Sequence, residues 1–161
     1  MKKVNEIMID SPFYCEAGES LLAVARQMSA ASVSSIPVVN AHNKVIGMIR
    51  DRDICVVFSD ESSYPLSERT VEDAMSQEVY TCTPEDNLDT VLKAMRLNRV
   101  GQLVVVDEQE RLAGIVTLST VVKRLYGSNE TQIQYTGSEN ILKTLYSLAD
   151  RNMKEYVSVT I

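Results

Sequence analysis

A dense group of charges directly follows an apolar stretch of the chain. Arg50, Asp51, Arg52 and Asp53 come straight after the run Val45–Ile49, with no loop residues between them. If a helix starts here, its unpaired backbone N–H groups and partial positive charge attract phosphate or ribose oxygens. A carboxylate one turn into such a helix can accept hydrogen bonds from two ribose hydroxyls. These residue types therefore predict a site for a sugar-bearing anion at a strand-to-helix junction.

The same four residues also have a purely structural interpretation. Acidic residues in the first turn of a helix stabilise the helix dipole by roughly 0.3–1 kcal/mol without any ligand. Asp51 and Asp53 would lie in that turn, and Arg50 and Arg52 would pair with them at the surface. Short motifs are hypotheses until their structural context is known, so both interpretations stay open.

The sequence repeats itself with an offset of 67 residues, which carries Val4 onto Val71. No gap is needed between Val4 and Ile54, and the matches fall on apolar and glycine positions. They include Met8 with Met75, Cys15 with Cys82, Leu21 with Leu88, Val24 with Val91, Met28 with Met95, Val33 with Val100 and Gly47 with Gly114. Two copies of one supersecondary unit are therefore indicated.

Each copy has the pattern of a β-α-β-β-α unit. Apolar residues at helical spacing predict the first helix, and β-branched runs that do not alternate with polar residues predict strands buried on both faces. A unit of about 55 residues has a marginal core, so the copies should pack together. The expected elements are Phe13–Cys15, Ser20–Ala31, Ile36–Val39, Val45–Ile49 and Asp51–Phe58, then Val79–Cys82, a helix with Leu88, Val91, Leu92 and Met95, Leu103–Val106, Leu112–Val116 and Leu118–Tyr126.

The repeats divide the chain into residues 1–60, residues 61–127 with a linker of loop composition at their start, and a C-terminal segment of residues 128–161. In that segment, Ser138 can cap an amphipathic helix from about Glu139 to Asn152. Its apolar stripe needs a partner, which could be its own module, a second subunit or another protein. The final residues alternate like a strand, so the segment is either paired with something or is the start of a further domain.

Composition argues against several classes of function. The net charge of −6 and the absence of a basic cluster disfavour nucleic acid and anionic membranes as partners. No run of about 18 apolar residues is present, and residues 1–6 lack the apolar core of a signal peptide. We therefore expect a cytoplasmic protein.

The chemistry-bearing residues do not form a catalytic set. Cys15, Cys55 and Cys82 are odd in number and include no CxxC pair, so neither a disulfide framework nor a zinc site is expected. His42 is the only histidine and lies in a turn-like stretch, where we expect a solvated side chain. Without a nucleophile, base and orienting group, the sequence does not predict an enzyme.

The repeated unit resembles the CBS-domain pair, or Bateman module, over roughly Val4–Gly127. The resemblance depends on the motif Gly-apolar-apolar-Thr-x-x-Asp at Gly47–Asp53 and again at Gly114–Thr120. It depends also on Ile36-Pro37-Val38-Val39 before the turn and on Cys82-Thr83-Pro84 before the first helix of the second copy. The stretch 103–119 also resembles a segment of the γ subunit of AMP-activated protein kinase.

The resemblance implies an α+β fold of two pseudo-symmetric β-α-β-β-α repeats packed sheet to sheet, with a helical tail. It implies two clefts between the repeats, each of which typically accepts AMP, ADP, ATP or S-adenosylmethionine, none of them an obligatory cofactor. It also implies a homodimer in which two modules form a flat disc. On this basis we expect a non-catalytic regulatory module that senses an adenosine ligand and signals to a regulated protein or a further domain.

The family motif also suggests roles for particular residues. Asp53 matches the aspartate that holds ribose, while Arg50 replaces the threonine that approaches phosphate, so Arg50 or Arg52 is expected at phosphate. In the second copy Thr117 is retained, but Thr120 replaces the aspartate, which puts ribose binding there in doubt. Ligand contacts are thus expected from the set Arg50, Asp51, Arg52, Asp53, Thr117 and Thr120.

The resemblance implies that the segment just before the first helix of each copy, which carries the matched cysteines, lines the adenine pocket. The resemblance implies that the backbone of Cys15 and Cys82 reads the adenine edge, and Ile36 and Pro37 are also expected among the ligand-binding residues. The alternative is that the cysteines are small, half-buried core residues.

The positions just before the second copy's central strand favour a weakly charged ligand. The kinase γ-like segment has basic residues there, but this chain has Gly101 and Gln102, with Ser34 and Ser35 in the first copy. Arg99 is displaced from those positions. A monophosphate or S-adenosylmethionine is therefore expected to fit better than a triphosphate. The alternative function is a dimeric interaction scaffold whose degenerate clefts bind nothing.

Overall fold

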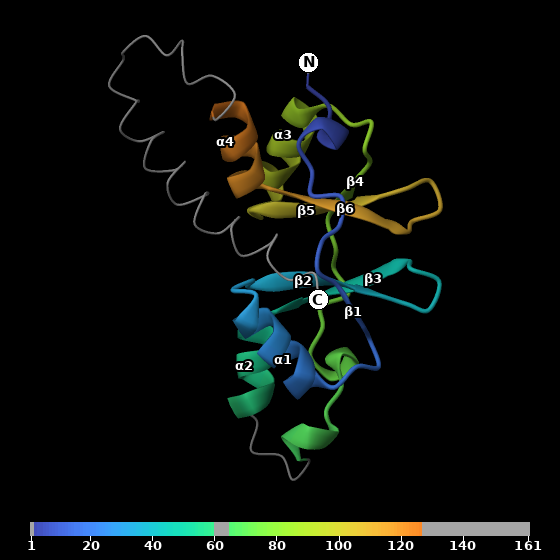
Figure 1. Cartoon of the computed structure of the whole chain (residues 1–161), viewed down its shortest axis with the longest axis vertical. Coiled ribbons are helices and arrows are strands. Elements are labelled where there is room, and N and C mark those ends of the chain that lie inside the picture. The colour runs from blue at the N-terminus through green and yellow to red at the C-terminus, as the bar shows by residue number, and fades with distance from the viewer. Residues whose placement is uncertain (1, 60–64, 127–161) are drawn as a thin grey trace, which may run out of the picture.

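The computed structural model describes residues 2–59 and 65–126 and confirms both β-α-β-β-α units (Figure 1). The first unit contains β1 (Cys15–Glu16), α1 (Leu21–Ala30), β2 (Ser35–Val39), β3 (Val45–Arg50) and α2 (Asp51–Ser59). The second contains β4 (Thr81–Cys82), α3 (Leu88–Asn98), β5 (Gln102–Val106), β6 (Leu112–Thr117) and α4 (Leu118–Tyr126). Short 3-10 helices lie ahead of the units, η1 (Val4–Glu6) before the first and η2 (Leu66–Glu68) and η3 (Val71–Asp73) before the second.

The two units build identical three-stranded sheets that face each other across the middle of the molecule. The strand orders are β1-β2-β3 and β4-β5-β6, with the first pair parallel and the second antiparallel in each sheet. Helices α1 and α2 lie on the outer side of one sheet, and α3 and α4 lie on the outer side of the other (Figure 1). This arrangement confirms the predicted sheet-to-sheet packing and explains why β2 is buried along its whole length.

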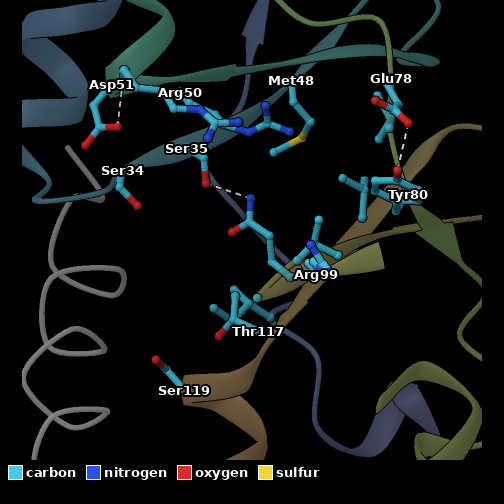
Figure 2. Close-up of a pocket in the computed structure, with 17 residues that line it drawn as sticks. Ser34, Ser35, Met48, Arg50, Asp51, Glu78, Tyr80, Arg99, Thr117 and Ser119 are labelled. Atoms are coloured by element: carbon cyan, nitrogen blue, oxygen red, sulfur yellow. Dashed lines mark hydrogen bonds between the residues drawn. The ribbon is translucent and has the colours of Figure 1, made fainter. Parts of the chain in front are cut away.

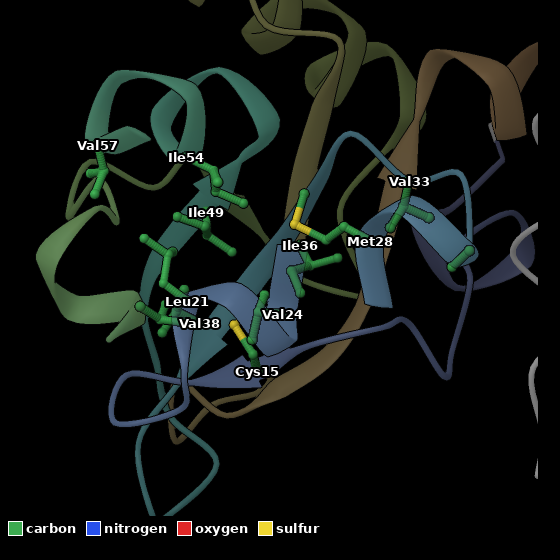
Figure 3. Close-up of a cluster of buried hydrophobic side chains, with 12 residues drawn as sticks. Cys15, Leu21, Val24, Met28, Val33, Ile36, Val38, Ile49, Ile54 and Val57 are labelled. Atoms are coloured by element: carbon green, nitrogen blue, oxygen red, sulfur yellow. The ribbon is translucent and has the colours of Figure 1, made fainter. Parts of the chain in front are cut away.

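The apolar stripe of the first helix packs as its spacing predicts. Ser20 caps α1 by accepting a hydrogen bond from the Ala23 N–H at 3.4 Å. Leu21, Val24 and Met28 then lie on one face and are all buried against the strands (Figure 3). Because successive turns of the helix bring these positions together, one stripe is enough to anchor the helix to its sheet.

Each unit completes the core of the other. Val4 and Ile7 precede the first unit in sequence, yet they are buried in the core of the second unit beside Val91. Val71 precedes the second unit, yet it is buried in the core of the first beside Leu21. The exchange is pinned by backbone hydrogen bonds, so the two units cannot separate without opening both cores.

Two glycines permit the close approach of these exchanged segments. Ile9 exchanges two backbone hydrogen bonds of 2.9 Å with Ile115 in β6, directly beside Gly114. A Cβ atom at Gly114 would lie 2.6 Å from the Ile9 carbonyl oxygen, and one at Gly47 would lie 2.9 Å from the Ser76 carbonyl oxygen. Real Cβ atoms do not approach a carbonyl so closely, and glycine is therefore the residue that fits.

The structure departs from the sequence expectation in the length of the outer strands. β1 begins at Cys15 rather than at Phe13, because only Cys15 and Glu16 pair with β2. β4 is likewise limited to Thr81–Cys82. The expected helix in residues 128–161 lies outside the described residues. Within the described part of the chain, no helix has both the length and the apolar content needed to cross a bilayer.

We expect Gly114→Ala to lower the free energy of unfolding by about 1–3 kcal/mol, because the added methyl group would push the Ile9 backbone away from β6. Chemical denaturation followed by circular dichroism measures the effect. Gly18→Ala is the matched control, since a Cβ atom at Gly18 meets nothing within 4 Å, and it should change stability by less than about 0.5 kcal/mol. Equal stability of the two variants would contradict the close approach.

Candidate ligand-binding site

A cavity of about 430 Å³ opens between the two facing units (Figure 2). Its volume lies within the range of about 300–1,000 Å³ typical of small-molecule sites. Its walls come from the ends of β3 and β6, the starts of α2, β2 and β5, and the segment before β4. The lining residues are Ile9, Ser34, Ser35, Met48, Arg50, Asp51, Arg52, Glu78, Val79, Tyr80, Arg99, Val100, Gly101, Gln102, Val104, Thr117 and Ser119.

The cavity lies across the pseudo-two-fold axis that relates the repeats. Residues at equivalent repeat positions face it together, namely Arg50 with Thr117, and Arg52 with Ser119. Ser34 with Gly101 and Ser35 with Gln102 are further equivalent pairs in the lining. The rest of the lining is not symmetric, since Glu78–Tyr80 and Arg99 come from the second copy without their first-copy equivalents. A ligand here would therefore contact both repeats but would meet different chemistry on each side.

A hydrogen bond crosses the axis between two equivalent residues. The side-chain amide of Gln102 donates to the Ser35 hydroxyl oxygen at 2.6 Å, and both residues line the cavity (Figure 2). Ser35 is only 8% exposed. This bond joins the first strand of one antiparallel pair to that of the other, so it ties the two sheets together at the cavity wall.

Three of the four charged residues at the junction of β3 and α2 line the cavity. Arg50, Asp51 and Arg52 line it, while Asp53 does not. The Asp53 carboxylate lies beneath the two arginines, with Oδ2 3.9 Å from Arg50 Nη1 and Oδ1 3.7 Å from Arg52 Nε. These distances are too long for hydrogen bonds. Asp53 Oδ2 is buried and accepts no hydrogen bond from the described residues, which leaves an acceptor available next to the cavity.

Thr117 and Thr120, at the junction of β6 and α4, are hydrogen-bonded to each other. The Thr117 N–H donates to Thr120 Oγ1 at 3.0 Å, the Thr120 N–H donates to Thr117 Oγ1 at 3.1 Å, and the Thr120 hydroxyl donates to the Thr117 carbonyl at 2.7 Å. Thr120 has no exposed surface, whereas Thr117 lines the cavity. These bonds cap the helix, so they occupy the Thr120 hydroxyl at the position where the CBS motif carries its aspartate.

Tyr80 and Glu78 form the end of the cavity that lies away from Asp51 (Figure 2). The Tyr80 hydroxyl donates to Glu78 Oε1 at 2.7 Å. This hydrogen bond raises the pKa of Tyr80 above its ordinary value, and desolvation acts in the same direction, while the positive charge of Arg50 lowers it. The tyrosine ring adds to the apolar part of the lining, which also includes Ile9, Val79 and Val104.

Four residues expected to bind the ligand, among them the two cysteines expected at the adenine pocket, are buried instead in or beside the cores. Cys15, Ile36 and Pro37 lie in or beside the core of the first unit, and Cys82 lies in that of the second. None of the four lines the cavity. Burial raises the pKa of the Cys15 and Cys82 thiols from 9.0 to about 12, with a smaller contribution from a nearby carboxylate in each case. This placement agrees with the core alternative for the cysteines.

Several lining residues were not identified as ligand contacts from the sequence. Glu78, Tyr80 and Arg99 belong to no motif, and they reach the cavity only because the sheets face each other. Other lining residues could have been found from the repeat. The offset of 67 residues aligns Ser119 with Arg52 and Gln102 with Ser35, so a residue at the cavity in one copy points to its equivalent in the other. Among the described residues, no group of three or more His, Cys, Asp or Glu side chains could hold a metal ion.

Comparison with known proteins identifies the family. A model of the CBS domain matches residues 4–60 and again residues 71–127, and the chain therefore belongs to the CBS domain family. The chain is similar to the inosine-5'-monophosphate dehydrogenase of Methanocaldococcus jannaschii, with 31% identity over 77% of this chain and 24% of that protein. It is also similar to the γ subunit of 5'-AMP-activated protein kinase from Saccharomyces cerevisiae, with 30% identity over 78% of this chain and 41% of that subunit.

The chain thus spans only about a quarter to two-fifths of these two curated relatives. Solved structures of similar size match more completely. The CBS domain pair of protein MJ0100, crystallised with 5'-methylthioadenosine and S-adenosylmethionine, is 25% identical with a TM-score of 0.67, over 80% of this chain and 98% of that one. A putative acetoin utilization protein (AcuB) of Vibrio cholerae is 26% identical with a TM-score of 0.73, over 83% and 99% of the two chains.

We expect a thiol reagent at about pH 8 to modify Cys55 rapidly and Cys15 and Cys82 slowly. Cys55 is exposed on α2, whereas the other two are buried and their raised pKa values keep them protonated, and the thiolate is the reacting form. The measurement is stoichiometry against time, with denatured protein as the reference for three reactive thiols. Rapid modification of all three in the native protein would contradict the buried placement.

Proposed function

We propose that this chain is a non-catalytic regulatory module that binds an adenosine ligand between its CBS repeats. The observation that carries the proposal is the cavity on the pseudo-two-fold axis, into which the strand-to-helix junctions of both repeats present Arg50 and Thr117. A guanidinium group such as that of Arg50 binds anionic oxygens, and the ring of Tyr80 offers a face that suits a flat base. The adenosine ligands named for the similar CBS pair of MJ0100 support this ligand class.

Occupancy of the cavity would be transmitted by the relation between the repeats. The ligand would contact both units, whose sheets are already joined by the bond between Gln102 and Ser35. A ligand can shift the arrangement only if it binds two arrangements with different affinity. We propose a homodimer as the receiving assembly, with a regulated protein or a further domain as the recipient of the signal.

Asp53 is the proposed ribose acceptor. Its Oδ2 atom is buried and without a hydrogen-bond donor among the described residues, and a buried polar atom of this kind calls for an explanation. A ribose hydroxyl reaching beneath Arg50 and Arg52 would supply the missing donor. Since the Thr120 hydroxyl is taken up by the cap of α4, the first copy has the better acceptor.

The second candidate function is an interaction scaffold with clefts that bind nothing. The occupied Thr120 hydroxyl favours it, because the second copy has lost the carboxylate of the family motif. The scaffold and the sensor differ in one observable property, which is the response of stability to adenosine compounds.

We expect at least one of AMP, ADP, ATP and S-adenosylmethionine to raise the melting temperature of the protein, because a ligand that binds only the folded state stabilises it by mass action. At a ligand concentration of about 100 times Kd, the stabilisation is about 2.7 kcal/mol. Thermal unfolding with and without each compound measures it, and calorimetry confirms binding. No response to any of the four would favour the scaffold.

We expect Asp53→Ala to weaken the adenosine ligand by roughly 1.5–3 kcal/mol, the size of a hydrogen bond to a charged group. Titration calorimetry on the variant and the parent protein measures the change. Asp89→Ala is the matched control, because Asp89 is also an acidic residue in the first turn of a helix but is exposed and does not line the cavity.

Two other results would place the ligand differently. Unchanged affinity of Asp53→Ala together with a loss in Thr117→Ala would assign the ligand to the second copy. Tighter binding would mean that Asp53 acts only as a counter-ion that restrains Arg50 and Arg52, and this would contradict the ribose contact.

A further inference from the structure

The helices of the second unit expose apolar side chains on their outer side. Leu118, the first residue of α4, is 47% exposed, and Val122, about one turn further along α4, is half-buried. Leu92 of α3 packs against the core of the second unit with part of its surface and is also half-buried. We refer to these three residues as the α3–α4 face.

The repeat shows that the three residues of the α3–α4 face share one surface. The offset of 67 residues aligns them with Ala25, Asp51 and Cys55, which line a single groove of about 400 Å³ between α1 and α2. The second unit has the same fold, with α3 and α4 on the outer side of its sheet (Figure 1). The α3–α4 face is therefore the counterpart of that groove.

The two copies differ in the chemistry of this surface. Where the first copy has alanine, aspartate and cysteine, the second has leucine, leucine and valine. An aspartate in the first turn of a helix is stabilised by the helix dipole, whereas an exposed leucine there is not. A single exposed apolar residue needs no explanation, but three that replace small or charged residues at one place indicate an interaction surface.

The segment that follows α4 has the complementary pattern. Residues 127–161 lie outside the described residues, and the sequence predicts an amphipathic helix over residues 139–152. Its apolar residues recur at a spacing that gathers them on one side of a helix. They are Ile141, Leu142, Leu145, Leu148 and Ala149. Because such a helix is stabilised mainly by packing its apolar side, it needs a partner surface.

The length of the connection favours the α3–α4 face of the same chain. The connection between α4 and the predicted helix, residues 127–138, spans at most about 40 Å when extended. α4 has 9 residues and is about 14 Å long, so the segment can turn back along it. The helices of the first unit lie on the far side of both sheets (Figure 1). Since the entropy cost of closing a loop rises with its length, the nearest apolar surface is preferred.

We propose that residues 139–152 form a helix whose apolar side packs on the α3–α4 face of its own chain. The contact is intramolecular, so it forms at any protein concentration. It leaves the helices of the first unit uncovered, and with them Cys55. No residue of the α3–α4 face lines the cavity, so the inference does not depend on ligand binding.

Hydrogen exchange measured by mass spectrometry on the full chain tests the contact. We expect the amides of residues 139–152 to exchange about tenfold faster or more in Leu118→Asp than in the parent protein, because a charge replaces a buried leucine at the interface. Aspartate is the residue of the first copy at the equivalent position, so the fold should be retained.

Leu97→Asp is the matched control for this exchange measurement. Leu97 is also an exposed leucine of the second unit, but it lies five residues after Leu92 and so on a different side of α3. Exchange of residues 139–152 should stay as slow in this variant as in the parent protein. Equal exchange in Leu97→Asp and Leu118→Asp would overturn the proposal.

Variants of the segment test the contact from the other side. In the full chain carrying Leu118→Cys, the thiol introduced at the start of α4 should react with a thiol reagent about tenfold faster when Leu145→Asp is added. Ser147→Asp is the control, because Ser147 lies on the polar side of the predicted helix. Cys55 should react at the same rate in all of these proteins. Faster reaction of Cys55 with Leu145→Asp would place the segment on the first unit and overturn the inference.

The remaining outcomes concern other occupants of the α3–α4 face. Protection of residues 139–152 that is lost on dilution would mean that a second copy supplies the contact. Exchange of these residues in the parent protein as fast as in an unstructured peptide would mean that this segment does not cover the face. Either result overturns the inference and leaves the proposed adenosine module standing.

Discussion

The reciprocal exchange of short segments between the repeats is the constraint on which the structure depends. Val4 and Ile7 fill the core of the second unit, and Val71 fills that of the first. A unit of this size buries little apolar surface alone, so a core that needs residues from both sides of the pseudo-axis makes folding of one unit conditional on the other. The glycine contacts at Gly47 and Gly114 fix the exchanged segments against the sheets at backbone distance.

The cavity is a consequence of that exchange. Once the segments are exchanged, the two sheets must face each other, and the strand-to-helix junctions of both copies open toward the same space. Divergence between the copies then makes the site asymmetric. One side carries guanidinium groups where the other carries hydroxyls, and Tyr80 with Glu78 closes one end only. A duplicated fold has in this way produced a site whose two sides differ in their side chains.

The proposed signal would use the same arrangement. Gln102 and Ser35 hold the sheets together across the axis within the wall of the cavity. A ligand that contacts both repeats competes with or adds to that bond, so its binding energy depends on how the repeats are set. This is the differential affinity that any ligand-driven shift requires. Arg50, Arg52 and Arg99 line the cavity that would hold such a ligand, and the Asp53 Oδ2 atom, which accepts no hydrogen bond from the described residues, lies next to it.

The sequence by itself determined the architecture. The 67-residue register and the helical stripe through Leu21, Val24 and Met28 predicted both units, and their facing arrangement followed from the family resemblance. These features are local or periodic, and the spacing of apolar residues along the chain shows directly which face of each helix or strand is buried. Arg50, Arg52 and Thr117 were predicted as ligand contacts from the strand-to-helix motif; the structure places all three at the cavity, while the contact with a ligand stays a prediction.

Only the tertiary structure decided which residues share the site. It brought in Arg99 and Glu78, placed Cys15 and Pro37 in or beside the core, and set Asp53 beneath two arginines rather than on the cavity wall. Such placements depend on how two sheets are oriented and on which side of a strand faces the partner unit. A sequence pattern specifies the faces of single elements, whereas contacts between elements distant in sequence are set by the packing of the whole fold.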